Sequence, residues 1–503
     1  MLASSLANSL SLSRVKLAGG SRALNGAFVR CRTNKGGRGI RVIRGRGGGG
    51  EGGRCKRQFS TELGRNPLDV TLEGLRSFKG GLKDAARVGS DKYFPVILPS
   101  RIKGNYAVPA AALCFTSAGL ITVLISVGGL TRLTKSGLSM VHWSPLKLSP
   151  PGTREEWEIE FERYKEFPEW QQRKSMTLDE FKYIFYWEYG HRMLGRLVGG
   201  VYGAGLAALV LTRRVPPGYH GRLFGLLALG GAQGAVGWWM VKSGLGEDRR
   251  GDRREIRVSP YRLAAHLCTA FVTYAGLVWT GFELIFPEGD RRQAASIAQK
   301  RLAKLKTSEA AKVLQGVKKF RGATMATTAL TFLTVASGAF VAGNSAGNAY
   351  NDWPYMNGEL IPWFDMVHDD YIGDGAIYRK LFENTAVVQF DHRILAYFTT
   401  FAVGATILSG KALNNTAAGA LKLLTPQVRR ATMVMGGLTI AQISLGISTL
   451  IMNVPVHLAA THQLGSLAVL TSGMYLTHSL RYLALIKVGT NAAAKTARVV
   501  AKL

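Results

Sequence analysis

Long apolar runs recur along the chain and alternate with strongly polar stretches. Each run has about 20 residues, the length that one helix needs to cross a hydrocarbon core roughly 30 Å thick. Charged residues are almost absent inside the runs, which predicts membrane spans near 108–130, 192–211, 221–241, 261–284, 323–343, 392–410, 431–452 and 457–480. The predicted fold is therefore an all-α membrane protein of eight transmembrane helices, not a chain of two or three soluble domains.

The second half of the chain repeats the first. The matching stretches are Glu188-Tyr189-Gly190-His191-Arg192 with Gln389-Phe390-Asp391-His392-Arg393, Gln233–Gly237 with Gln442–Gly446, and Leu263–His266 with Leu458–His462. Four crossings return the chain to its starting side. The copies are thus predicted to be parallel repeats, each a four-helix bundle in which a cofactor can sit between facing helices.

The N-terminal segment is basic and precedes the predicted bundles. Residues 1–50 contain ten Lys and Arg and no acid, with frequent Ser and Leu, which is typical of a mitochondrial transit peptide. The stretch Arg57-Gln58-Phe59-Ser60 resembles a matrix-processing site, so residues 1–59 are expected to be removed. The Gly/Arg stretch 45–54 could indicate RNA binding, but it would leave with the leader.

Basic residues gather in alternate loops. The chain has 64 Lys and Arg against 32 Asp and Glu, and an excess of Lys and Arg marks the inner side of a membrane. Both termini are therefore predicted to face the mitochondrial matrix, in a multi-pass protein of the inner membrane, and no nucleic-acid binding is expected. The loop 242–260 is an exception, because it is rich in Arg and falls on the outer side.

These patterns divide the chain into six segments. They are the transit peptide 1–59, a matrix-facing segment 60–107, a first bundle 108–285, a basic matrix linker 286–322, a second bundle 323–480 and a matrix tail 481–503. The cysteines Cys31, Cys55, Cys114 and Cys268 show neither metal nor disulfide spacing. We expect no zinc site and no disulfide framework.

Four of the nine histidines recur in register, namely His191, His266, His392 and His462. Each lies near the outer start of its span, which predicts one pair in the outer half of each bundle. Ionisable residues inside a membrane are costly and usually functional, and paired imidazoles are axial ligands of haem iron. A lone histidine of this kind would more often make a structural hydrogen bond, but the duplication favours haem ligation.

The other histidines receive a simpler interpretation. His142, His220, His368 and His478 are expected to be solvated in loops or at a span end, and His457 to point away from His462.

Charged neighbours of the histidines suggest two further roles. Arg192 and Arg393 could pair with haem propionates, because a guanidinium binds a carboxylate bidentately; an interfacial charge reaching water is the alternative. Glu188 lies one helical turn before His191, whereas its counterpart is Gln389. A carboxylate there could relay protons or bind a polar group of a substrate, or be a solvated acid at the rim. The asymmetry predicts that the first half holds a reacting haem and the second a permanent one.

Several of these stretches resemble signatures of the haem A synthase family. They are Ile125–Thr134 with Gly137–Met140, Glu188–Arg196, Asn351–Pro354 and Asp391–Arg393. The resemblance covers nearly all of the predicted mature chain. It implies an enzyme that oxidises the C8 methyl of haem O to a formyl group by two successive hydroxylations, giving haem A for cytochrome c oxidase.

The resemblance also implies roles for individual residues. His392 and His462 would bind a resident haem b, His191 and His266 would serve the substrate haem O, and Glu188 would be the essential acid. The first outer loop lacks the cysteine pair of some bacterial members, so no thiol-based electron route is expected there, which leaves the electron donor open. The resemblance to mitochondrial members implies ferredoxin and its reductase as the electron source. Self-association and contact with haem O synthase are suggested by likeness alone.

Two other functions fit parts of the pattern. A bis-histidine b-type electron-transfer cytochrome also pairs histidines in a helical bundle, but it does not explain the exchange of Glu188 for Gln389 or the long outer loops. A transporter could be built from duplicated halves, but the sequence shows no clearly interrupted spans.

Overall fold

The computed structural model describes residues 107–142, 148–246, 256–368 and 377–486, and in these ranges it is helical with no β-strand. This confirms the all-α prediction for the described part of the chain. The predicted transit peptide 1–59, almost all of the segment 60–107 and residues 487–503 of the predicted tail lie outside the described residues.

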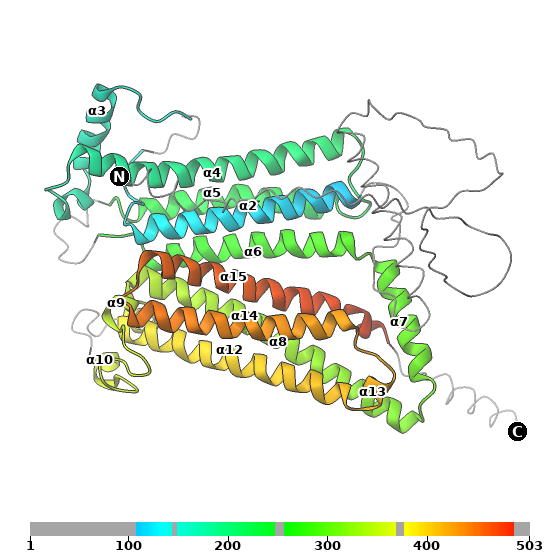
Figure 1. Ribbon diagram of the computed structural model, residues 1–503. Coiled ribbons are helices and arrows are strands. Elements are labelled where there is room, and N and C mark those ends of the chain that lie inside the picture. The colour runs from blue at the N-terminus through cyan, green and yellow to red at the C-terminus, as the bar shows by residue number, and fades with distance from the viewer. Residues whose placement is uncertain (1–106, 143–147, 247–255, 369–376, 487–503) are drawn as a thin grey trace, which may run out of the picture. The chain divides into compact units, whose positions relative to one another are not determined.

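Eight long helices account for most of the described residues, and each overlaps one predicted span (Figure 1). The first half contains α2 (Ala107–Leu133), α4 (Leu178–Leu211), α5 (His220–Lys242) and α6 (Pro260–Ile285). The second half contains α8 (Thr307–Asn344), α12 (Thr385–Asn414), α14 (Pro426–Ile451) and α15 (Val456–Ser479). Shorter helices are α3 (Arg154–Lys165), η1 (Pro168–Gln172), α7 (Glu288–Leu302), α9 (Ala346–Ala349), α10 (Trp363–Val367), α11 (Ile377–Glu383), α13 (Ala417–Ala420) and η3 (Arg481–Leu485).

Seven of the long helices are long and apolar enough to cross a membrane, namely α2, α4, α5, α6, α8, α12 and α14. Helix α15, at the predicted eighth span, is not among them. Its 24 residues include no Asp, Glu, Lys or Arg, but repeated Thr, Ser, Gln and His lower its mean hydropathy. At 1.5 Å per residue it is about 36 Å long, so its polarity and not its length sets it apart.

Two helices begin well before the apolar runs that predicted them. Helix α4 begins at Leu178, where Thr177 and Glu180 form a reciprocal capping box. Helix α8 begins at Thr307, so the predicted linker 286–322 is occupied by α7 and the first turns of α8. Hydropathy finds only the apolar part of a helix. At α4 the capping box marks the true start, whereas α8 is extended by polar turns and its N-cap residue, Lys306, makes no side-chain cap.

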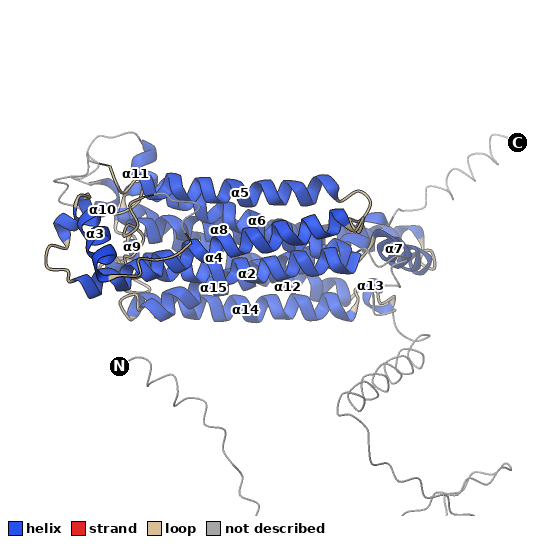
Figure 2. Cartoon of the chain, turned by 90° about the horizontal axis from the view of Figure 1, so that it is seen from above, coloured by secondary structure: helices blue, strands red, loops and turns tan. Residues whose placement is uncertain are grey.

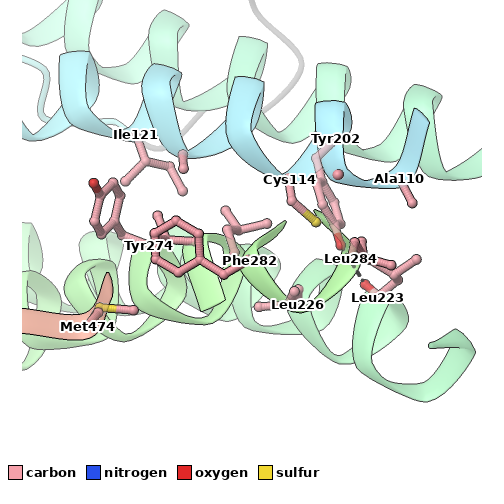
Figure 3. Close-up of a cluster of buried hydrophobic side chains, with 14 of the residues drawn as sticks. Ala110, Cys114, Ile121, Tyr202, Leu223, Leu226, Tyr274, Phe282, Leu284 and Met474 are labelled. Carbon is pink, nitrogen blue, oxygen red and sulfur yellow. Dashed lines mark hydrogen bonds between the residues drawn. The ribbon is translucent and has the colours of Figure 1, made fainter. Parts of the chain in front are cut away.

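The two halves share an apolar core. Helix α2 packs against α4 and α6 in the first half, α8 packs against α12 and α14 against α15 in the second, and α6–α8 and α2–α15 contacts join the halves (Figure 2). Met474 of α15 belongs to the same buried cluster as Cys114 and Ile121 of α2 (Figure 3). The histidine-bearing helices α4, α6, α12 and α15 are therefore held within one packed unit.

Candidate functional site

The four duplicated histidines form two pairs. In the first half, His191 of α4 and His266 of α6 are close enough for their charges to interact, and in the second half the same holds for His392 of α12 and His462 of α15. The structure thus brings together the residues of each predicted pair across two helices.

Each of the four imidazole rings lies against a glycine of a neighbouring helix. A Cβ atom added to Gly128 of α2, Gly237 of α5 or Gly446 of α14 would lie 2.8 Å from the Cε1 atom of His191, His266 or His462. At Gly338 of α8 the corresponding distance to Cε1 of His392 would be 3.1 Å. Any larger residue would have to displace the ring, so these glycines determine where the imidazoles can lie.

A glutamine holds the second histidine of each pair. The Nε2 atom of Gln233 lies 3.1 Å from Nδ1 of His266 and donates to the His266 carbonyl at 2.7 Å. Gln442 has the same contacts with His462, at 3.1 and 2.9 Å. Each glutamine lies four residues before the contacting glycine, so both face the same histidine. An amide nitrogen can only donate, so its hydrogen bond to Nδ1 forms only when Nδ1 is unprotonated. When Nδ1 carries the proton and Nε2 is free, the acceptor beside the ring is the backbone carbonyl of Gln233 or Gln442.

The first histidine of each pair is held differently in the two halves. The Nδ1 atom of His392 lies 2.8 Å from the hydroxyl oxygen of Ser337. In the first half the residue matching Ser337 is Val127, and Nδ1 of His191 is buried with no hydrogen-bond partner among the described residues.

These features fit a haem with two imidazole ligands. Among the described residues, the Nε2 atoms of the four histidines make no hydrogen bond to protein groups, which leaves that nitrogen for a metal. Within the same residues no cluster of three or more His, Cys, Asp or Glu could hold a metal ion by itself. A paired-imidazole site needs only two protein ligands, because the porphyrin supplies the other four.

Glu188 is buried and fully bonded, with only 3% of its surface exposed. One carboxylate oxygen accepts hydrogen bonds from the Ser139 hydroxyl and the Met140 amide, both at 2.8 Å. The other accepts from the Arg192 guanidinium at 2.6 Å. The alternative of a solvated rim acid is therefore wrong. Glu188 is an ion-paired carboxylate that ties the chain after α2 to α4, one turn before His191.

The matching position in the second half carries no charge. Gln389 is buried, its Nε2 atom lies 3.4 Å from the Tyr350 carbonyl, and its Oε1 atom is unpartnered within the described residues. Arg393 donates instead to the carbonyls of Tyr350, Asp352 and Tyr355, at 2.8 to 3.1 Å. The same helical position thus anchors an outer loop in both halves, but the carboxylate is present in only one.

The two arginines predicted to bind propionates are engaged with protein groups. Arg192 donates to the carbonyls of Met140 and His142 in addition to Glu188. Arg393 lies near Asp352, whose carboxylate accepts the amides of Asn357 and Gly358. Burial alone would raise the pKa of Asp352, but these amides and the Arg393 charge lower it below its usual value. Pairing of either arginine with a propionate stays a prediction.

The remaining histidines are mostly where they were expected. His142, His220, His368 and His457 are exposed. The expectation that His478 is solvated is wrong, because its ring is 3% exposed and packs against Trp279, Phe282 and Phe286. Aromatic side chains from α6 cover this end of α15, which its position at the end of an apolar run did not reveal.

Sequence reasoning missed the residues that support the histidines. They are the four contacting glycines Gly128, Gly237, Gly338 and Gly446, the glutamines Gln233 and Gln442, and the hydroxyl groups of Ser139 and Ser337. The matched Gln–Gly stretches of the third and seventh spans contained part of the signal, since a repeated glutamine inside an apolar run needs a polar partner.

The chain matches one family of known proteins over most of its length. Residues 111–474 match the family described as "Cytochrome oxidase assembly protein". The chain is 41% identical over 389 residues to the Homo sapiens protein named "Heme A synthase COX15", covering 77% of this chain and 85% of that one. It is 37% identical over 388 residues to the "Heme A synthase" of Nitrosomonas eutropha, covering 76% and 98%.

A third relative has a second part. The Schizosaccharomyces pombe protein named "Heme A synthase-mitochondrial ferredoxin fusion protein" is 40% identical over 372 residues, covering 72% of this chain. This chain spans 58% of the length of that relative.

Proposed function

The chain belongs to the haem A synthase family of cytochrome oxidase assembly proteins, and from that premise we propose that it oxidises the C8 methyl of haem O to a formyl group by two successive hydroxylations. The observation that carries the proposal is that each half contains a matching pair of histidines, and that each imidazole ring packs against a glycine of a neighbouring helix. One site would hold the substrate and the other a resident haem b.

The second half suits the resident haem. Its ligands would be His392 and His462, each with a protein group at Nδ1. The first half suits the substrate, because its histidine His191 follows a carboxylate, Glu188. The matching position in the second half is the neutral Gln389. A bound haem supplies redox chemistry at its iron, and the protein supplies position and charge.

Glu188 contributes through its fixed place near His191. Three donors orient the carboxylate, and one of them, the Arg192 guanidinium, compensates its negative charge. We propose that Glu188 accepts or returns a proton at the substrate when the Arg192 contact loosens, and otherwise orients the Ser139–Met140 turn over the site. Arg192 and Arg393 would contact propionates through the same loosening of the outer loops.

The proposed topology has eight crossings with both termini in the matrix. Seven helices qualify as spans by length and apolarity. Helix α15 would be the eighth, since it packs against α14, α8 and α2 inside the bundle and its polar groups can be satisfied by other helices. Mitochondrial relatives support an inner-membrane location with a removable leader at 1–59.

Ferredoxin is the electron source that we propose. The fusion of the two proteins in one relative supports it, because fused proteins keep their partner at a high effective concentration. Ferredoxin reductase, contact with haem O synthase and self-association are further proposals, which rest on the family likeness.

The proposal is tested by product analysis of the full-length protein. The chain is expressed in a membrane that supplies haem O, with ferredoxin, its reductase and oxygen, and the extracted haems are separated by mass into b, O and A. We expect haem A together with retained haem b. A protein that binds haem b but forms no oxidised haem would instead support the electron-transfer cytochrome.

A further inference from the structure

The two histidines that follow Glu188 and Gln389 differ at Nδ1. Ser337 of α8 lies 2.8 Å from Nδ1 of His392, whereas Nδ1 of His191 is buried without a hydrogen-bond partner in the described part of the chain. Ser337 precedes the contacting glycine Gly338 as Val127 precedes Gly128. The repeat therefore places a hydroxyl group in one half and an apolar side chain in the other.

The Ser337 hydroxyl fixes the proton of the His392 ring. Its oxygen also lies 2.8 Å from the backbone carbonyl of Thr334, which can only accept a hydrogen bond. A hydroxyl has a single proton, so donation to Thr334 leaves the oxygen to accept from Nδ1–H of His392. The neutral ring then has an unprotonated Nε2 atom, which is the form that binds a metal.

The first half has the carbonyl but lacks the hydroxyl. The carbonyl of Leu124 matches that of Thr334 and faces the His191 ring as Thr334 faces His392, but its contact with Nδ1 falls short of a well-formed hydrogen bond. The orientation of His191 is therefore set by packing against Gly128 and by a backbone carbonyl, with no side-chain partner at Nδ1 among the described residues.

We propose that Ser337 is a positioning residue that makes the second-half site the tighter of the two haem sites, and that Val127 keeps the first-half site exchangeable. The inference rests on the proposed function. A hydrogen bond from Nδ1–H orients a metal-binding histidine and raises its basicity. A resident haem needs a durable bond, whereas a substrate must enter and its product must leave.

The test compares three variants of the purified full-length protein. Ser337→Ala removes the hydroxyl, Ser337→Thr keeps it, and Val127→Ser adds one to the first half. Ser126→Ala is the matched control, because within the described residues the Ser126 hydroxyl bonds only the Thr122 carbonyl of its own helix. Haem release to excess apomyoglobin gives the rate, and a redox titration of the low-spin haem gives the midpoint potential.

We expect Ser337→Ala to release haem b about 10- to 100-fold faster, the usual cost of losing such a partner. Its midpoint potential should rise, because a less basic imidazole stabilises ferric iron less. Ser337→Thr should behave as the wild type, Val127→Ser should slow haem release from the first site, and Ser126→Ala should change neither quantity.

The outcomes separate this inference from the proposed function. Equal release rates and potentials in wild type and Ser337→Ala, with haem b bound, overturn the inference alone. The same holds if Ser337→Ala and Ser337→Thr are impaired equally without a change in potential, since that indicates a packing defect. If Ser337→Ala acts as expected but the wild type forms no haem A, the proposed function fails and the positioning role of Ser337 stands.

Discussion

In the first half of the molecule, Glu188 and Arg192 form a buried ion pair beside His191, whereas in the second half Arg393 binds loop carbonyls beside a neutral Gln389. The helices, the glycines and the second histidine of each pair are matched, so these differences are local. Each half has a polar group that the other lacks. The first half has the Glu188 carboxylate, and the second has the Ser337 hydroxyl at Nδ1 of His392. Duplication kept the frame that holds the imidazoles, and the polar groups around it diverged.

The largest effect is expected from removing a histidine of the second half. His462→Ala should abolish tightly bound haem b, a loss greater than the roughly 10- to 100-fold that removing a supporting hydrogen bond costs a metal site. His392→Ala should do the same. Haem content per protein and the low-spin spectrum measure the change.

The control for these variants is His457→Ala. His457 lies on the same helix as His462 but is exposed, so its loss should leave the haem content unchanged. An intact bis-imidazole spectrum in either His392→Ala or His462→Ala contradicts the ligand assignment.

Glu188→Gln tests the difference in charge, because it gives the first half the side chain of the second. The amide keeps one acceptor for the Ser139–Met140 turn but removes the negative charge that Arg192 compensates. We expect haem b to be retained and haem A formation to fall by about 100-fold or more, as for loss of a proton-transfer group.

Asp179→Asn is the matched control, since Asp179 is an exposed acid near the start of the same helix. Wild-type product formation in Glu188→Gln would show that Glu188 serves only to anchor the outer loop.

Substitution of the contacting glycines tests whether His191 and His392 are packed equally tightly in the two halves. Gly128→Ala places a Cβ atom 2.8 Å from His191, and Gly338→Ala places one 3.1 Å from His392. Overpacking of this kind typically costs about 1–3 kcal/mol, and we expect the larger disturbance at Gly128. Haem spectra and thermal stability measure it.

Gly119→Ala on the same helix is the control, because a Cβ atom there meets open space. An undisturbed haem spectrum in both Gly128→Ala and Gly338→Ala would mean that the rings are free to move.

Hydropathy predicted helices well where the apolar run and the helix coincide. The spans 221–241 and 261–284 differ by only one residue at each end from α5 (His220–Lys242) and α6 (Pro260–Ile285). The starts of α4 and α8 were missed because polar turns extend both helices beyond the apolar run.

The repeat predicted the four histidines but not their surroundings. A pattern along one helix does not specify which residue of a neighbouring helix it will meet, so the contact of His191 with Gly128 required the packed structure. The burial of Glu188 was missed for a similar reason, because its partners Ser139 and Met140 come from a loop whose path the sequence does not specify.

The smallest effect is expected at Thr269, whose hydroxyl has no counterpart in the second half. Thr269 donates to Oε1 of Gln233 at 2.5 Å, whereas Gly465 occupies the matching position and Oε1 of Gln442 is buried without a partner in the described part of the chain. Thr269→Ala should therefore make the first half resemble the second, at a cost of about 1 kcal/mol in stability. Thr273→Ala is the control, since among the residues that the structure describes this hydroxyl bonds only the Thr269 carbonyl of its own helix. Thermal unfolding in detergent should show a lower midpoint for Thr269→Ala than for Thr273→Ala. Equal midpoints would mean that Gln233 is held by its contacts with His266 without help from the Thr269 hydroxyl.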